Sequence, residues 1–408
     1  MKILLVTQYF WPESFRINDL VKAWTDLGHD VTVLAGLPNY PAGKLFPGYT
    51  WRGPYRERYQ GADVRRVPLI PRGANRGARL ALNYLSFVLA GIGVGPFVAR
   101  GRFDVAFVYA PSPITICIPA IWFKFLRGTP IAFWVQDLWP DNLTAIGAVK
   151  SPRILRAVTA LSRWIYRHCD VVLVQSAAFI GPIRRVCPEV KKLRVLPNWA
   201  DDFYQPQTVE ADAPERREFP DGFTIVFGGN LGSAQALGTV LDAAALVAGE
   251  GVHWVFIGDG NQRVVLEEHC RARGLESVVT FLGWRPSEAM PRYLALADVL
   301  LVSLKRDESF ASTIPAKLQS SLAVGRPILA ALEGEGARIV SDSGAGVVVE
   351  PENAEALAAG ARAMLAAGRE GREAMGRNGR AYSARHFDRD TLVAELDGWL
   401  RELVEART

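Results

Sequence analysis

The stretch Ala297–Val349 decides the fold: ADVLLVSLKRDESFASTIPAKLQSSLAVGRPILAALEGEGARIVSDSGAGVVV. Asp298–Ser303 and Pro327–Ala331 are short apolar runs, which predict two buried strands. Between them we predict a helix over Ala316–Val324, because Pro315 suits the start of a helix and Gly325 suits its end. A strand, a helix and a second strand in this order predict a parallel α/β sheet.

The N-terminus of that helix is a candidate anion site, since its free N–H groups and its dipole attract negative charge. Ser312 and Thr313 are expected to cap the first turn. Lys317 lies in the same turn, where a cation is unfavourable without an anionic partner, and a diphosphate is the partner that we expect. The alternative is a lysine that is merely solvated.

Length and composition favour two cytosolic domains with anionic partners. The chain has 408 residues, 49% of them hydrophobic, and a formal net charge of +5. Its four cysteines follow no paired or zinc-binding spacing, which is typical of free thiols. The start, MKILLVTQYFWPE, predicts a strand and not a signal peptide. No run has the roughly eighteen uncharged residues that a membrane-spanning helix needs.

The chain in order predicts two successive α/β domains. Strand and helix patterns alternate from Lys2 to Leu196, and a polar, proline-rich passage over Asp201–Pro220 predicts a linker. A second alternating series begins at Phe223. We therefore expect an N-terminal α/β domain over 1–200, a second α/β domain over 201–388, and a terminal helix within 389–408 that returns to the first domain. No GxGxxG follows the first strand, which argues against a dinucleotide dehydrogenase.

The segment 44–97 combines basic and aromatic residues with an apolar run over Leu80–Phe97. Only Glu57 and Asp63 oppose its cations, which are Lys44, Arg52, Arg56, Arg58, Arg65, Arg66, Arg72, Arg76 and Arg79. Such a composition suits an anionic membrane surface. A solvated basic face over an internal helix is the alternative. Nucleic acid is not expected, because no recognition motif accompanies the charge.

The loops after the first-domain strands supply the candidate acceptor residues. Ligands bind beyond the carboxyl ends of parallel strands, which is where Asp137 falls. Glu13, Arg16 and Asn18 lie on the loop after the first strand and are expected at the same edge. A structural loop aspartate is the alternative for Asp137.

Motifs spread over nearly the whole chain resemble family 4 glycosyltransferases of GT-B fold. The pieces, in order, are LGHDVTVL, LPNWAD, FGGNLGSAQAL, IGDG, FLGW, ADVLLVSL, LAVGRPIL and RNGRAYSARHF. Each is weak alone, but eight in the right order form a strong pattern. QYFWPES, FWVQDLWPD, STIPAKLQS and EGEGARIV resemble the branch that builds O-antigen, capsule and colanic-acid-type polysaccharides.

The resemblance implies two Rossmann-like, doubly wound domains facing a central cleft. It further implies a retaining transfer from a UDP-sugar without a metal or other cofactor. Asp137, Lys317 and Glu308 are the residues that we assign to catalysis. The donor set is Gly229, Asn230, Gln235, Gly258, Trp284, Lys305, Ser312, Thr313, Lys317 and Glu335; the acceptor set is Glu13, Arg16, Asn18 and Asp137. For Trp284, contact with the base and packing in the core are both open.

Two departures from the family pattern affect donor recognition. Family members commonly carry Arg and Lys after the glycine turn, where this chain has Asn230 and Ala234. The usual second glutamate of a pair eight apart is replaced by Ser320, twelve residues after Glu308. The donor sugar therefore does not carry over from the resemblance.

The expected function is transfer of an N-acetylated hexosamine or a deoxyhexosamine to a lipid-linked saccharide, at the cytoplasmic face of the bacterial inner membrane. The alternatives are a UDP-sugar 2-epimerase of related architecture and a non-catalytic nucleotide-sugar-binding scaffold.

Overall fold

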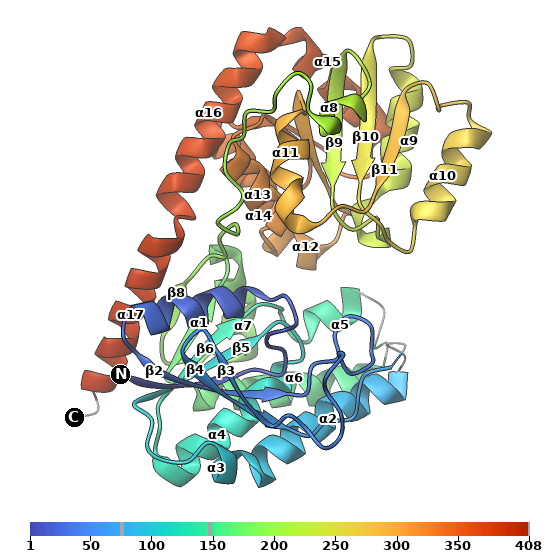
Figure 1. The fold of residues 1–408 in the computed structure, drawn as a ribbon. Helices are drawn as coiled ribbons and strands as arrows, with labels where there is room; N and C mark the ends of the chain where they lie inside the picture. Colours follow the sequence, from blue (N-terminus) through green and yellow to red (C-terminus); the bar gives the residue numbers. More distant parts are fainter. Residues whose placement is uncertain (74–76, 146–148, 150, 407–408) are drawn as a thin grey trace. The chain divides into compact units, whose positions relative to one another are not determined.

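A computed structural model describes residues 1–73, 77–145, 149 and 151–406. The chain divides into two compact units, which are shown as ribbons in Figure 1. Unit 1 comprises Met1–Leu196 and Asp390–Thr408, and unit 2 comprises Pro197–Arg389. The corresponding boundaries expected from the sequence fall at 200/201 and 388/389.

Unit 1 contains an eight-stranded sheet of order β3-β4-β2-β1-β5-β6-β7-β8, parallel except for the pair β3–β4. Its strands are β1 (Lys2–Val6), β2 (Asp30–Gly36), β3 (Arg56–Tyr59), β4 (Ala62–Val67), β5 (Val105–Ala110), β6 (Ile131–Val135), β7 (Val171–Val174) and β8 (Leu193–Val195). Its helices are α1 (Arg16–Asp26), α2 (Gly77–Gly93), α3 (Gly95–Val98), α4 (Cys117–Arg127), α5 (Asp141–Ala145), α6 (Pro152–His168), α7 (Ile180–Val186) and α17 (Arg389–Glu405).

Unit 2 contains a six-stranded, all-parallel sheet of order β11-β10-β9-β12-β13-β14. Its strands are β9 (Phe223–Gly228), β10 (Val252–Ile257), β11 (Val279–Gly283), β12 (Val299–Ser303), β13 (Ile328–Ala331) and β14 (Gly346–Val349). Its helices are α8 (Pro214–Arg217), α9 (Leu237–Leu246), α10 (Arg263–Ala272), α11 (Met290–Ala295), α12 (Glu308–Ser312), α13 (Ala316–Val324), α14 (Gly334–Ser343), α15 (Ala354–Ala366) and α16 (Gly368–His386).

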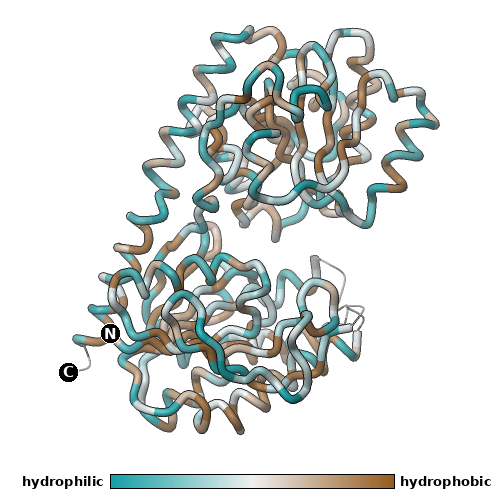
Figure 2. Tube along the Cα trace, viewed as in Figure 1, coloured by the Kyte–Doolittle hydropathy of each residue, from teal (hydrophilic) through white to brown (hydrophobic). Residues whose placement is uncertain are grey.

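The central strands of unit 2 are apolar on both faces, which is why helices cover both. Along β12, Val299 and Leu301 join one core cluster, whereas Leu300 and Val302 join clusters on the opposite face. These strands are brown in Figure 2, while the more exposed α16 is largely teal. The two doubly wound α/β domains predicted from the sequence are confirmed.

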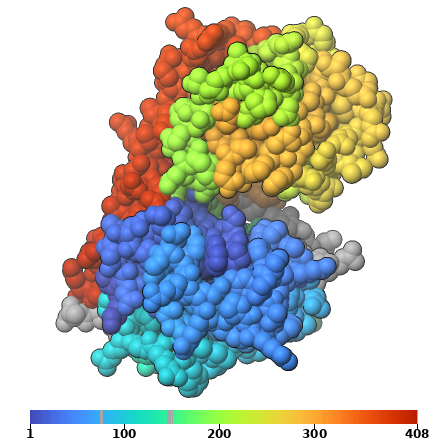
Figure 3. Space-filling view, in the orientation of Figure 1, coloured from blue at the N-terminus to red at the C-terminus, as the bar shows by residue number. Residues whose placement is uncertain are grey.

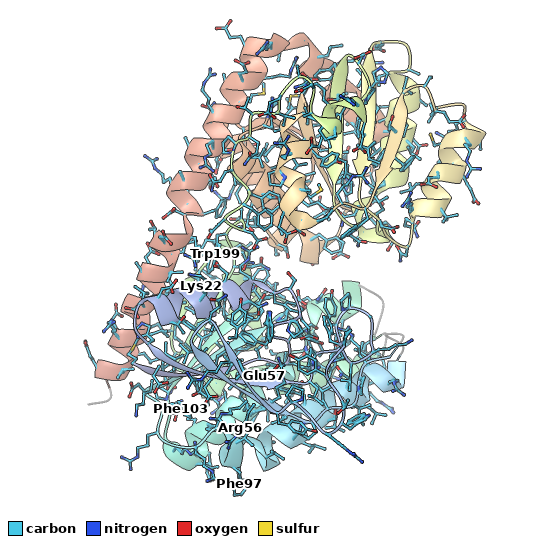
Figure 4. All side chains as sticks on the ribbon, in the orientation of Figure 1. Lys22, Arg56, Glu57, Phe97, Phe103 and Trp199 are labelled. Carbon is cyan, nitrogen blue, oxygen red and sulfur yellow. The ribbon has the colours of Figure 1, made fainter. Side chains whose placement is uncertain are left out.

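The strand pair β3–β4 changes the interpretation of the basic segment. Arg66 is buried on β4, and its guanidinium donates to the carboxylate of Glu57 on β3 and to the backbone oxygens of Gly36 and Trp11. Glu57 is labelled in Figure 4. The prediction that this segment faces a membrane is therefore wrong for Arg66, which fastens loops to the sheet. Arg76 lies outside the described residues.

Helix α17 is attached to unit 1 by polar contacts along its length. His29 Nε2 lies 2.7 Å from the carboxylate of Asp397, and Arg194 donates to Glu402 over 2.6 Å. The Arg194 guanidinium also lies over the Trp399 ring, 4.9 Å from its centroid. No helix within the described ranges is both long and apolar enough to cross a bilayer.

Candidate active site

The donor-side residues gather at the carboxyl edge of the unit 2 sheet. Lys317 is the second residue of α13, as predicted, and its Nζ lies 4.1 Å from the centre of the Phe227 ring. The same nitrogen donates to Oε1 of Gln235, on the short 3-10 turn Ser233–Gln235. Burial lowers the pKa of Lys317 to about 7. An amine of lowered pKa is therefore held at this edge, and no carboxylate lies within ion-pair distance of it in the part of the chain that the structure describes.

Gly229 makes room for Lys317. A side chain at residue 229 would place its Cβ 2.6 Å from Cε of Lys317, and φ is +128° at this glycine. From the family resemblance, Gly229 and Asn230 belong to a glycine-rich turn that lets the backbone approach a phosphate, and this stays a prediction. The N–H groups of two glycines at this edge already have partners, since Gly229 N–H donates to Ile257 and Gly258 N–H donates to Gly283, each over 2.8 Å.

These glycines allow two backbone segments to pack closely against each other at the edge of the sheet. A Cβ at Gly258 would lie 1.9 Å from the carbonyl oxygen of Gly229, where φ of Gly258 is +145°. Asn230 fills the space beside them, since its side-chain amide lies against both Gly232 and Gly260. Trp284 follows Gly283 directly and is 65% exposed, so packing in the core is excluded for it. Contact of Trp284 with a base remains a prediction.

The remaining donor candidates lie around the ends of β12 and β13. Lys305 is exposed, and its backbone N–H donates to the carbonyl of Ala234 over 2.9 Å, which places it beside the 3-10 turn. It lines a hollow of about 230 Å³ together with Ser233 and Glu352. Lys305 and Lys317 therefore both contact the Ser233–Gln235 turn.

Helices α12 and α14 bring a second group of candidates together. A Cβ at Gly334 would lie 2.0 Å from the Ala311 carbonyl, so only glycine permits this contact between the two helix ends. Glu308 is exposed at the start of α12. Glu335 is bound by Arg338 of its own helix, over 2.6 and 3.2 Å, so its carboxylate already has a partner.

The N-cap residue of α13 is Pro315, which has no side-chain capping group. Ser312 and Thr313, whose side chains are able to cap this turn, precede it, and Ser312 Oγ donates to the carbonyl of Glu308 over 3.2 Å. The free backbone N–H groups in the first turn of α13 therefore need hydrogen-bond acceptors other than the N-cap side chain.

In unit 1, Asp137 follows β6 at the carboxyl edge and is largely buried. Burial raises its pKa to about 7, and a hydrogen bond with the side chain of Asn142 opposes the shift. Glu13 is also buried, and burial raises its pKa to about 7. Its carboxylate accepts the N–H groups of Phe10, Asn39 and Tyr40 at 2.7–3.1 Å, so Glu13 organises two loops of this edge.

The other first-loop candidates differ in their roles. Asn18 donates to Glu13 O over 2.7 Å and accepts from Trp11 N over 3.1 Å, so both ends of its amide stabilise the loop. Arg16 is half-buried at the start of α1, and its charge acts on buried Tyr109 at the end of β5. Asp137 and Arg16 therefore share one edge of the sheet, whereas Glu13 and Asn18 hold its loops in place.

Sequence reasoning did not single out four residues at this edge: Arg72, Tyr9, Tyr40 and Tyr84. Arg72 donates to the hydroxyl of Tyr9 over 3.3 Å and lies 4.9 Å from the centre of the Tyr40 ring. Burial raises the pKa of Tyr84, and the charge of nearby Asp137 adds to the shift. Tyr84 stands beside Asn83 within an otherwise apolar helix, and that interruption was the available signal. Within the described ranges, no group of three His, Cys, Asp or Glu side chains is arranged to hold a metal ion.

Two doubly wound α/β domains, with a lysine and glycine turns at the carboxyl edge of the second sheet, have the architecture of the GT-B fold. Sequence comparison identifies the family. The model of "Glycosyl transferase 4-like domain" matches residues 14–199, and that of "Glycosyl transferases group 1" matches residues 209–382. The chain belongs to the family 4 glycosyltransferases.

Individual relatives agree with this assignment. The chain is 28% identical over 382 residues to the putative colanic acid biosynthesis glycosyl transferase WcaI of Escherichia coli, covering 90% of this chain and 92% of WcaI. It has the fold of the sucrose-phosphate synthase of Thermosynechococcus elongatus (TM-score 0.78, 18% identity, 99% of both chains). Anabaena HepE, solved with UDP-glucose, has the same fold (TM-score 0.70, 18% identity, 98% of this chain and all of HepE).

Proposed function

We propose that this enzyme transfers a sugar from a UDP-sugar to a lipid-linked saccharide during assembly of a surface polysaccharide. The observation that carries the donor assignment is Lys317, a half-buried lysine whose amine is held between the Phe227 ring and Gln235 and becomes a cation when a diphosphate binds. The polysaccharide role is supported by the likeness to WcaI over most of both chains, and the UDP-linked donor by the shared fold of HepE.

In the proposed reaction, the bond from the anomeric carbon to the diphosphate oxygen breaks, and UDP leaves with the electron pair. The acceptor hydroxyl oxygen bonds to the same face of that carbon, which retains the configuration, and its proton passes to a phosphate oxygen of the leaving group. Lys317 stabilises the charge that develops on the diphosphate. No metal is needed in this scheme. Asp137 accepts a hydrogen bond from the acceptor hydroxyl and orients it.

The test uses labelled UDP-glucose, UDP-galactose and their N-acetylated forms with a polyprenyl diphosphate that carries one N-acetylhexosamine, in EDTA. We expect one donor to label the lipid, with the anomeric configuration retained by NMR. Lys317→Ala should lower the rate at least a hundredfold, while Lys22→Ala, a surface lysine on α1, should not change it. A new UDP-sugar formed without acceptor would show a 2-epimerase instead. Binding of UDP-sugars without turnover would show a scaffold.

The same proposal includes attachment to the membrane, through the helices of unit 1 and not through the basic loops. Helix α2 contacts α3 and α4, and α4 contacts α6. These helices expose large apolar side chains, among them Phe97 (69% exposed) and Phe125 (79% exposed). Phe97 points outward from α3 in Figure 4. An apolar groove of about 480 Å³ runs beside Phe125, Trp122 and Trp164.

The charge around this apolar surface matches a bilayer with anionic lipids. Exposed arginines lie on α2, on α6 and on the segment after α3: Arg79, Arg100, Arg102, Arg153, Arg156, Arg163 and Arg167. Of these, Arg163 and Arg167 pair with Glu189. Apolar side chains that enter the interface, with cations beside them, are the two features of peripheral binding. The lipid of the acceptor would then lie in the same bilayer.

Vesicle sedimentation tests the attachment. We expect binding to vesicles that contain 30% phosphatidylglycerol and little binding to pure phosphatidylcholine. The double change Phe97→Ser and Phe125→Ser should abolish it. Val264→Ser, at an equally exposed apolar position of unit 2, is the matched control. Equal binding by both variants would disprove this surface.

A further inference from the structure

A second cavity lies at the amino edge of the unit 2 sheet, opposite the edge that holds Lys317. It has a volume of about 680 Å³ and is lined by the residues that precede three strands: Gly222 before β9, Asp298 before β12 and Pro327 before β13. Since β9 spans six residues, the two edges lie roughly 17 Å apart along the strand. The cavity is therefore separate from the proposed donor site.

The walls of the cavity come from three parts of unit 2. The linker supplies Arg216 and Phe219, the turn after α13 supplies Arg326, and the first turns of α16 supply a basic face. Figure 3 shows the linker in light green between α16 in red and the α11 region in orange. On α16, residues 369, 372, 373 and 377 follow helical spacing, so they share one face. The cavity is thus a concave pocket, open to solvent, with walls from several elements.

The lining carries an excess of positive charge. Five arginines (Arg216, Arg326, Arg369, Arg372 and Arg377) face three carboxylates (Asp221, Asp298 and Glu373). Arg372 pairs with Asp298 over 3.3 Å, and Arg369 pairs with Glu373 over 2.8 Å. Within the described ranges, no carboxylate lies within ion-pair distance of the other three arginines.

Arg326 shows why this arrangement favours an anion. Its guanidinium donates to the carbonyl of Ala295. Burial lowers its pKa; the charges of Asp298 and Glu373 oppose that shift, and those of Arg369 and Arg216 add to it. Cations held together in a partly desolvated space repel one another and lose hydration. A bound anion offsets both the repulsion and the lost hydration.

We propose that this cavity binds a small phosphorylated metabolite, with its phosphate groups among Arg216, Arg326 and Arg377, the three lining arginines without a carboxylate partner among the described residues. Guanidinium groups bind phosphate oxygens in pairs, and several around one cavity suit a diphosphate or a phosphorylated sugar. The concave shape favours a small molecule over a nucleic-acid duplex. A ligand here bridges the linker, the sheet edge and α16, so it stiffens unit 2 without entering the donor site.

Calorimetric titration with inorganic pyrophosphate tests the proposal. The full chain carries Lys317→Ala in every sample, so that the proposed donor site contributes no binding. We then compare Arg377→Glu with Arg385→Glu. Both residues are exposed on α16, but only Arg377 lines the cavity. We expect pyrophosphate to bind the Lys317→Ala protein, and the dissociation constant to rise at least tenfold with Arg377→Glu but less than twofold with Arg385→Glu.

Three results would overturn the proposal. They are equal affinity in the two charge variants, no binding to the Lys317→Ala protein, and a random-sequence DNA duplex that binds through Arg377 where pyrophosphate does not. In the otherwise unchanged chain, Arg377→Glu should leave sugar transfer without pyrophosphate unaltered. Because the readout is binding with the donor site disabled, it does not depend on the proposed sugar transfer.

Discussion

Binding of UDP to this protein should take up a proton, because Lys317 is largely neutral before the ligand arrives. Burial lowers the pKa of its amine from 10.5 to about 7. At pH 8, about nine in ten empty molecules therefore carry a neutral Lys317. The negative charge of a bound diphosphate favours the ammonium form and returns the pKa towards its ordinary value.

The size of the effect follows from the shift. The full difference of 3.5 pKa units corresponds to at most about 4.8 kcal/mol of coupling between the proton and the ligand. Binding at pH 8 should take up about 0.9 proton, and the dissociation constant for UDP should rise about tenfold between pH 8 and pH 9. In this interval the phosphates of UDP are already fully ionised and its uracil N3–H, which ionises at higher pH, is still mostly protonated, so the trend belongs to the protein.

Isothermal titration calorimetry of UDP at pH 8, in HEPES and in Tris, measures the proton uptake directly. These buffers differ in ionisation enthalpy, so the observed binding enthalpy changes between them in proportion to the protons taken up. Lys317→Arg is the control, since arginine stays charged and should give the same enthalpy in both buffers. If the unchanged protein also gives the same enthalpy in both, Lys317 is already charged and the reasoning fails.

Three further changes test other parts of the structure. Asp137→Asn should abolish most sugar transfer, and it should stabilise the fold at pH 8 by up to about 4 kcal/mol but not at pH 4. The reason is that folding raises the pKa of the Asp137 carboxyl from 3.8 to about 7, so the ionised carboxylate destabilises the folded protein as pH rises through that window. Urea unfolding at both pH values measures the stability gain, and an equal gain at both would contradict the assignment. Arg66→Met should lower the free energy of unfolding by about 3–5 kcal/mol, since it leaves Glu57 without its charge partner. The control Arg58→Met, at an exposed position of β3, should lower it by less than about 0.5 kcal/mol. Similar unfolding midpoints for the two variants would refute the buried role of Arg66. Gly258→Ala should lower the thermal unfolding midpoint by several degrees, because the added Cβ would lie 1.9 Å from the Gly229 carbonyl oxygen. Gly238→Ala should leave the midpoint unchanged, since no atom lies within 4 Å of the added Cβ. An unchanged midpoint for Gly258→Ala would show that the turn relaxes easily.

The sequence predicted the strands and helices of unit 2 well, because they are long, apolar and separated by glycine and proline. Helix α13 ends at Gly325, where φ is +75°, as the residue type predicts. The pair β3–β4 was missed because RERY and ADVRRV carry charges that resemble a solvated surface. From sequence alone, a charged side chain is predicted to be exposed unless its ion-pair partner is known. Glu57 becomes the partner of Arg66 only when the two strands pair.

Several site residues show the same limit. Glu13 and Asn18 were placed at the correct loop, but their hydrogen bonds go to backbone groups of that loop and of the one after β2. Glu335 was predicted near the donor, and its pairing with Arg338 appears only on the folded helix. Residue type and spacing indicate which loop a polar side chain occupies, but not which partner it meets there.

The sequence by itself determined the two α/β domains, the helix that carries Lys317 and the family to which the chain belongs, because periodicity, turn residues and motifs are local properties. Only the tertiary structure decided that Gly229 makes room for Lys317, that Arg66 is buried, and that the arginines of the linker, α13–β13 turn and α16 share one cavity. Those facts depend on contacts between residues far apart in the chain. Burial and charge pairing are properties of such contacts, and no single stretch of sequence contains them.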